Sequence, residues 1–306
     1  MRTSRRRAAV MLSAAVFTLP GVFAPSGAAD PAARAMASCA PASVTTALPA
    51  GLPLLDWSEN LGYDAQGNLW VSRLYRNEVQ RYDAAGTLTA SVPIEFPGAV
   101  RLGPDGLLYV VYGDTPSSAV RPGGVVRFDP ASSAPEPAVF VSGFVMPNGA
   151  AFDSSGDLYV ATLSGVVRVH ADATIDTGWG RSAAGVAANG IAVHGEDLYV
   201  TSNGGPLGRV VRIPLAAPTD RVTVVDLASP LAGVPDFADD LLADPAGVLF
   251  VTTLAGQLIR VDPATGSVCV VLSGQPMTSV VAVPDHPEEV LAGTEGGDIV
   301  RIRLSG

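Results

Sequence analysis

Six copies of one strand–turn–strand unit run through the chain, and this repeat constrains the fold more than any other feature. Each copy has an apolar strand, a turn that is mostly rich in Asp and Gly, and a second apolar strand, usually of the form Leu-Tyr-Val. A third strand with a central Arg follows each pair, and these arginines recur at intervals of 41–48 residues. The copies begin at Leu61, Val100, Ala150, Ile191, Leu241 and Val281. Because this period is typical of a propeller blade, the sequence predicts an all-β, six-bladed β-propeller.

The sixth copy ends without an outer strand of its own, and an unpaired sheet edge invites aggregation. We expect the segment Ser43–Leu48, which precedes the first copy, to complete the last blade. That closure would place Cys39 near the outer strand of the neighbouring blade, Ser267–Leu272, which carries Cys269. The two cysteines would then form a disulfide that staples the ring; the alternative is two unpaired thiols.

The first 37 residues have the pattern of an export signal, which leaves residues 38–306 for the propeller. A basic stretch that includes Arg5–Arg7 precedes an apolar run from Ala8 to Phe23, and small residues follow. The apolar run is short for a membrane-spanning helix, although a retained anchor is the alternative. We therefore expect a secreted or extracytoplasmic protein, periplasmic or in the cell envelope, with no stable membrane insertion after the signal is removed.

Composition excludes several classes of function. The formal net charge is −10, and loss of the signal would make it more negative, so nucleic acid is not expected as a partner. The chain contains no Lys, which excludes Schiff-base chemistry. It has no Gly-x-Ser-x-Gly motif, and its two cysteines lack the neighbouring histidines of a zinc site.

One position at the start of each inner strand carries the candidate chemistry. Equivalent positions in all blades face the same end of the central channel, and four of the six hold an oxygen-bearing carboxylate or amide. These hard oxygen donors suit Ca²⁺, whereas zinc or copper would call for nitrogen or sulfur ligands. The alternative is that the two Asn-Gly pairs are turn residues only. The six residues are Glu59, Gly98, Asn148, Asn189, Asp239 and Ser279.

With Glu in the first blade, Asn in the third and fourth, and Asp in the fifth, the chain resembles the senescence-marker-protein/gluconolactonase-like superfamily of calcium-dependent six-bladed propellers. Paraoxonases and diisopropylfluorophosphatase-type phosphotriesterases are relatives of that superfamily. The resemblance covers essentially the whole chain after the signal. It implies that Glu59, Asn189 and Asp239 bind the metal, that Asn148 binds the metal or contacts substrate, and that Asp240 contributes as well.

One departure from the family pattern bears on the substrate. Gluconolactonase-like enzymes carry a sugar-binding Arg two residues before the equivalent of Asn148, and this chain has Met146 there. An apolar lactone or ester is therefore the expected small-molecule substrate, contacted by Met146, Asn148 and Asp240. Ca²⁺ would polarise the carbonyl group, and Asp239 would act as general base or nucleophile, with Asp240 or Asp236 holding the proton.

Two other readings stay open. The propeller could be a non-catalytic platform for a small molecule or a protein, or a metal-dependent enzyme of different chemistry, such as a phosphotriesterase or an isomerase. Large apolar residues flank the candidate positions and would form either a pocket rim or packing between blades. We expect a monomer. The flanking residues are Trp57, Phe96, Phe144, Met146, Trp179 and Phe237.

Overall fold

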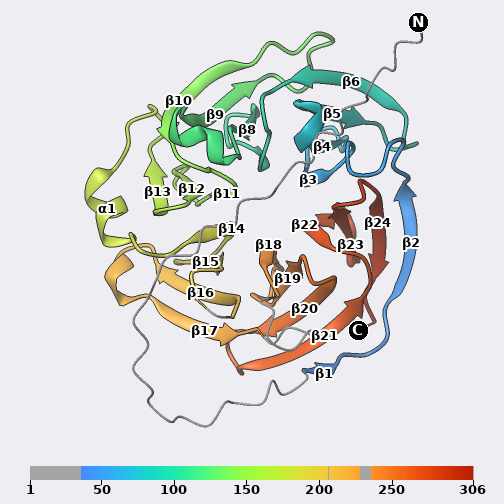
Figure 1. Cartoon of the computed structure of the whole chain (residues 1–306), viewed down its shortest axis with the longest axis vertical. Helices are drawn as coiled ribbons and strands as arrows, with labels where there is room; N and C mark the ends of the chain where they lie inside the picture. Colours follow the sequence, from blue (N-terminus) through green and yellow to red (C-terminus); the bar gives the residue numbers. More distant parts are fainter. Residues whose placement is uncertain (1–35, 206, 228–235, 306) are drawn as a thin grey trace, which may run out of the picture. The chain divides into compact units, whose positions relative to one another are not determined.

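The computed structural model describes residues 36–205, 207–227 and 236–305, and within these ranges the chain forms six sheets arranged as a ring (Figure 1). The predicted six-bladed β-propeller is thus confirmed. The predicted signal falls almost entirely on residues 1–35, which lie outside the described residues. Among the residues described, no helix is long and apolar enough to cross a membrane.

Each blade is an antiparallel sheet that runs outward from the channel. The first blade consists of β3 (Ser58–Tyr63), β4 (Leu69–Arg73), β5 (Glu78–Tyr82) and β6 (Leu88–Pro93). The second consists of β7 (Val100–Leu102), β8 (Leu108–Tyr112), β9 (Gly123–Phe128) and β10 (Ala138–Phe144). The third consists of β11 (Ala150–Phe152), β12 (Leu158–Thr162) and β13 (Gly165–Val169). The fourth blade consists of β14 (Ala188–His194), β15 (Asp197–Ser202), β16 (Arg209–Pro214) and β17 (Val222–Asp226). The fifth contains β18 (Ala238–Ala243), β19 (Leu249–Thr253), β20 (Gln257–Asp262) and β21 (Ser267–Ser273). The sixth blade consists of β22 (Met277–Val283), β23 (His286–Thr294), β24 (Ile299–Arg303) and β2 (Ser43–Leu48).

The repeated Asp and Gly of the sequence form the turn between the first two strands of a blade. In the first blade, the Asp64 carboxylate accepts the backbone N–H groups of Gln66 and Asn68, at 3.0 and 2.9 Å. Gly67 follows at φ 79°, a left-handed conformation that costs glycine little. Asp244 and Gly247 repeat this arrangement in the fifth blade. These side-chain-capped turns explain why the pattern recurs at a fixed place in each repeat.

The hydrophobic core is divided into layers between neighbouring blades. Both faces of each sheet are covered by adjacent sheets, so the second strands carry a short continuous apolar run rather than an alternating pattern. Leu108 and Val110 pack against the first blade, for example, whereas Tyr109 and Val111 pack against the third. The inner strands β3, β7, β11, β14, β18 and β22 contact one another in that order, and β22 contacts β3. The core therefore holds the inner strands as a closed ring around the channel.

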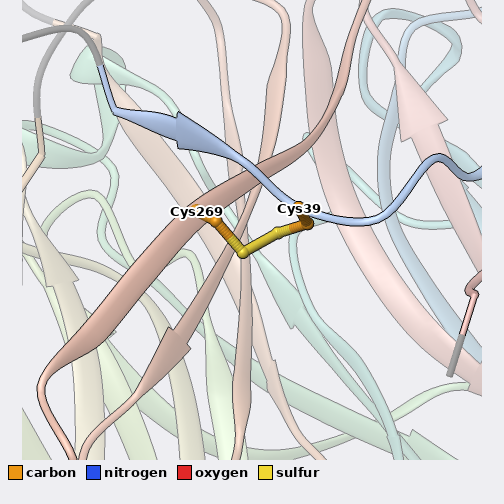
Figure 2. Close-up of a disulfide and its surroundings, with 2 residues drawn as sticks. All are labelled: Cys39 and Cys269. Carbon is orange, nitrogen blue, oxygen red and sulfur yellow. A yellow bond between two sulfur atoms is a disulfide. The ribbon is translucent and has the colours of Figure 1, made fainter.

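The N-terminal part of the chain closes the ring as predicted. Strand β2 pairs antiparallel with β24, from Ser43 opposite Arg303 to Leu48 opposite Ile299. Strand β1 (Ala37–Ser38) pairs parallel with β21 and adds a fifth strand to the fifth blade. Between β1 and β2, Cys39 forms a disulfide with Cys269 (Figure 2). The disulfide prediction is confirmed, and it joins two segments that are 230 residues apart in the sequence.

The third blade differs from the others because it has three strands within the described residues. A short helix, α1 (Thr177–Ser182), follows β13 and contacts it. Trp179 on this helix is buried, packs edge-on against Tyr159, and donates its indole N–H to the Leu215 carbonyl at 2.8 Å. Trp179 therefore belongs to the core between the third and fourth blades and not to a pocket rim.

Candidate functional site

The start of each inner strand is fixed to its neighbour by hydrogen bonds across the blade boundary. The carbonyl of Asn148 accepts the N–H of Ala99, and the carbonyl of Asn189 accepts the N–H of Gly149, both at 2.9 Å. The carbonyl of Asp239 accepts the hydroxyl of Thr201. These bonds hold the backbones of the candidate residues in one rigid ring, which is a requirement for a preorganised site.

Two amide–carboxylate pairs form on this ring. Asn148 Nδ2 donates to Glu59 Oε1 at 2.9 Å, and Asn189 Nδ2 donates to Asp239 Oδ1 at 2.8 Å. The first pair joins the first and third blades, and the second joins the fourth and fifth. Because each amide turns its N–H group toward a carboxylate, its carbonyl oxygen is directed elsewhere. The structure thus places two of the four candidate ligands in contact in each pair, Glu59 with Asn148 and Asn189 with Asp239.

Two further residues complete the first pair: Asp114, which the sequence did not point to, and Trp57, which was expected only as a flanking apolar residue. Trp57 donates its indole N–H to Glu59 Oε2 at 2.6 Å, and Asp114 Oδ2 accepts Asn148 Nδ2 at 2.7 Å. Asp114 follows β8 at the far end of a second strand, whereas the sequence comparison considered only the starts of inner strands. Trp57 was considered only as an apolar residue, and its role as a hydrogen-bond donor was missed.

The carboxylates of the site raise one another's pKa values. Burial raises the pKa of Glu59, and the charge of Asp240 adds to the effect. Burial and the nearby Glu59 raise the pKa of Asp114 well above its usual range. Burial, followed by the charges of Glu59, Asp240 and Asp114, does the same for Asp239. Negative charge held together in this way would be stabilised by a bound cation.

The donor chemistry fits a hard cation that binds amide as well as carboxylate oxygens. Within the described ranges, no three or more His, Cys, Asp and Glu side chains are grouped so that they could hold a metal ion by themselves. A cation site in this part of the chain would therefore need amide oxygens as well. Asn189 Oδ1 is buried and accepts no hydrogen bond. A buried polar atom without a partner is costly, and a Ca²⁺ ion would satisfy it. Glu59, Asn148, Asn189 and Asp239 therefore fit a calcium site, with Glu59 and Asp239 supplying the negative charge.

Asp240 lies behind this site in a separate polar network. Its side chain is 3% exposed, and Oδ2 accepts Asn60 Nδ2 at 3.1 Å. Asn60 in turn accepts Arg101 Nη1 at 2.6 Å, and Arg101 Nη2 lies 3.8 Å from Asp240 Oδ1. This network joins the first, second and fifth blades through the channel. The substrate contact expected for Asp240 stays a prediction, because the side chain is almost wholly enclosed.

Three large residues beside the site adopt a left-handed backbone that non-glycine residues rarely adopt. Phe96, Met146 and Phe237 have φ values of 44°, 47° and 50°, and each lies two residues before the candidate position of its blade. Hydrogen bonds hold them there: Met146 N donates to the buried Ser118 Oγ at 2.7 Å, and Phe96 N to Asn77 Oδ1 at 2.8 Å. Strain of this kind collects at functional sites.

The exposure of the flanking residues separates rim from core. Phe237 is 44% exposed, and Phe96 and Met146 are half-buried. Phe144 is 5% exposed and packs in the core between the second and third blades. The apolar side chains that border the site are therefore a subset of those considered from the sequence.

Asp236 is a buried carboxylate three residues before Asp239 in the sequence, and its raised pKa makes the stability of the fold depend on pH. It is fully buried, and Oδ1 accepts the Gly208 N–H at 3.1 Å. Burial raises the pKa of Asp236 to about 6, from an ordinary value of 3.8. The folded protein therefore binds this proton more tightly than the unfolded chain does. This group's stabilising effect is complete below pH ~4 and is lost as the pH rises to about 6, a change of roughly 3 kcal/mol.

We expect Asp236→Asn to remove this pH dependence, because the amide keeps an acceptor for Gly208 without a buried charge. The variant should exceed the native protein in free energy of unfolding by about 3 kcal/mol at pH 8 and match it near pH 4. Urea unfolding at the two pH values measures the difference. Asp129→Asn in an exposed turn is the control; a gap between Asp236→Asn and native that does not change with pH would contradict the expectation.

Comparison with known proteins shows the fold through solved structures of similar shape. No family model matches the chain, and no curated protein does either. Among solved structures, a gluconolactonase from Xanthomonas campestris has a TM-score of 0.65 at 18% identity, over 89% of this chain and 97% of that one. The calcium-binding protein regucalcin from Agrobacterium tumefaciens has a TM-score of 0.64 at 16% identity, over 88% and 98%. The chain is a six-bladed propeller with the fold of gluconolactonase-like proteins.

The same fold also supports other chemistry. A PQQ-bound aldose sugar dehydrogenase from Streptomyces coelicolor matches this propeller with a TM-score of 0.64 at 17% identity, over 87% of this chain and 99% of that one. The resemblance expected from the sequence is thus confirmed at the level of the fold. Function has to be argued from the side chains at the channel mouth.

Proposed function

We propose that this propeller is a calcium-dependent hydrolase that opens an apolar lactone or cleaves an apolar ester at its channel mouth. The observation that carries the proposal is the pairing of Glu59 with Asn148 and of Asp239 with Asn189 on the ring of inner strands. These pairs combine carboxylates of raised pKa with amide oxygens, one of them buried and without a partner. The gluconolactonase and regucalcin structures of the same fold support the choice.

The side chains divide the work of such a reaction. When bound, Ca²⁺ would polarise the substrate carbonyl and stabilise the negative charge that develops on its oxygen. Glu59, Asn189 and Asp239 would hold the ion, with Asn148 as a further ligand or a substrate contact. Asp239 would accept a proton from the attacking water or attack directly. Trp57 would hold Glu59 in place through its 2.6 Å hydrogen bond.

The rim supports an apolar substrate. The gluconolactonase-like enzymes that the chain resembles carry a sugar-binding Arg at the position of Met146, and Met favours an apolar substrate instead. The backbone of Met146 is left-handed and is held by a hydrogen bond to Ser118. Phe237 leaves 44% of its surface in solvent, so an apolar ligand bound beside it would gain contact with the phenyl ring. The net negative charge of the chain also disfavours anionic polymers as partners.

We also propose that the protein acts outside the cytoplasm. The Cys39–Cys269 disulfide supports this, because such bonds persist in oxidising compartments. The basic and apolar pattern of the first 37 residues supports export as well.

Calcium titration of chelator-treated protein by calorimetry tests the proposal. We expect about one ion per chain, together with hydrolysis of lactones or aryl esters that stops when the ion is chelated and returns when it is restored. Phosphotriesters belong in the same assay, because their cleavage would point to the alternative metal-dependent chemistry. If the protein showed no calcium binding at millimolar concentrations, the hydrolase proposal would fail and a binding platform would be favoured.

A further inference from the structure

The second blade has no side chain at the position where the other blades place theirs. Gly98 occupies that position, and a Cβ atom there would lie 2.8 Å from the backbone oxygen of Asn148. Real Cβ contacts are essentially never so short, so a larger residue would displace Asn148. The packing of the ring therefore forbids a ligand from the inner strand of this blade.

Another part of the same blade fills the gap. Beyond the end of β8, the Gly113 N–H donates to the Glu95 carbonyl at 2.9 Å, and the Asp114 N–H donates to the Phe96 carbonyl at 3.0 Å. Gly113 has φ 82°, and a Cβ atom there would lie 2.6 Å from Gly123. This glycine lets the chain turn tightly, and Asp114 follows it at the channel mouth.

Asp114 faces the same amide as Glu59. Asn148 Nδ2 donates to both carboxylates, to Asp114 Oδ2 at 2.7 Å and to Glu59 Oε1 at 2.9 Å. Two buried carboxylates around one amide concentrate acidic groups at this point. Separately, the amide oxygen Asn189 Oδ1 is buried without a hydrogen-bond partner. The carboxylate and amide oxygens around this point thus have more acceptor capacity than the neighbouring hydrogen-bond donors satisfy.

We propose that Asp114 is the second blade's ligand to the cation, so that three carboxylates hold the ion together with the amides of Asn148 and Asn189; among the described residues, the acidic side chains form no cation site without these amides. Ligands would then come from five consecutive blades, with Glu59, Asp114 and Asp239 supplying the negative charge. This inference rests on the proposed calcium site. Five or more oxygen donors with three negative charges would bind Ca²⁺ more tightly than four donors with two charges. The competing explanation is that Asp114 only orients the Asn148 amide.

Terbium luminescence separates these explanations, because Trp57 is hydrogen-bonded to Glu59 and would sensitise a Tb³⁺ ion bound beside it. We expect emission from the native protein that Ca²⁺ displaces, and an at least tenfold weaker affinity for both ions in Asp114→Asn. The amide of that variant keeps an oxygen for Asn148 but has no charge. Asp129→Asn should bind as the native protein does, and Trp57→Phe should lose emission while calorimetry still detects Ca²⁺. Thermal melts in chelator confirm that each variant is folded.

The measurements test the calcium site and the role of Asp114 separately. If the native protein gave no sensitised emission and no calcium heat, both the site and the role of Asp114 would be overturned. If the native protein bound Ca²⁺ but Asp114→Asn bound it equally well, only the role of Asp114 would be overturned. Unchanged affinity in Asp114→Asn with weaker binding in Asp114→Ala would assign Asp114 to orientation of Asn148 and would likewise reject it as a ligand.

Discussion

Replacing Asp239 with Asn should abolish calcium-dependent hydrolysis, with a loss of at least about a thousandfold in turnover, while the propeller stays folded. The reason is that Asp239 would supply both a charge to the ion and the base or nucleophile for the substrate. The amide oxygen of the variant can still accept the Asn189 N–H, which is a 2.8 Å bond in the native protein. The ring of inner strands therefore keeps its hydrogen bonds. Steady-state assays at saturating calcium measure the loss.

Thermal stability gives this prediction a second, independent readout. Burial and the neighbouring carboxylates raise the pKa of Asp239 well above its ordinary range, so its charge destabilises the metal-free fold. We expect Asp239→Asn to melt at the same or a higher temperature than the native protein in chelator, and to gain little from added calcium. Asp129→Asn should behave as the native protein does. Native-like turnover in Asp239→Asn would remove Asp239 from the mechanism.

Loss of the disulfide should produce the largest change in stability. The bond between Cys39 and Cys269 closes a loop of 230 residues, and its main effect is to restrict the unfolded chain. For a loop of that length, the chain-entropy model gives roughly 5 kcal/mol, as an upper estimate. We expect the double variant Cys39→Ser/Cys269→Ser to lose several kcal/mol of unfolding free energy, measured by urea unfolding without reductant.

The matched control is the native protein in reductant, which should unfold at the same urea concentration as the double variant. Calcium affinity should change little in either case, because the disulfide lies at the outer edge of the fifth blade, beside β1 and β21, whereas the proposed site lies at the inner strand β18 (Figure 1). A double variant as stable as the oxidised native protein would show that β2 closes the ring without help from the disulfide.

The blade count and the closure could be predicted because each depends on local pattern. The turn formed by Asp64 and Gly67 is built from residues that are adjacent in sequence, so its repetition marks the blades directly. The pairing of Ser43–Leu48 with the last blade followed from an unpaired edge that had to be covered. The three-stranded third blade could not be predicted, since a six-residue helix is too short to show helical periodicity.

The candidate site was only partly visible in the sequence. Glu59, Asn148, Asn189 and Asp239 share one position in the repeat, and alignment of the copies finds such residues. Asp114 does not share that position, because it reaches the channel from the other end of a neighbouring strand. Residues that meet in space without sharing a register leave no periodic signal. The same reason hid the network of Asn60, Arg101 and Asp240.

The pairing of β2 with β24 has a consequence for biosynthesis. Strand β2 leaves the ribosome among the first segments of the fold, and its partner β24 leaves among the last. Until residues 299–303 have emerged, the early strand has no partner and the ring cannot close. The ring therefore closes only after its last blade has been synthesised. Before that point, β2 and the edge of the unfinished last blade are both unpaired, and both are accessible to a chaperone that binds the growing chain.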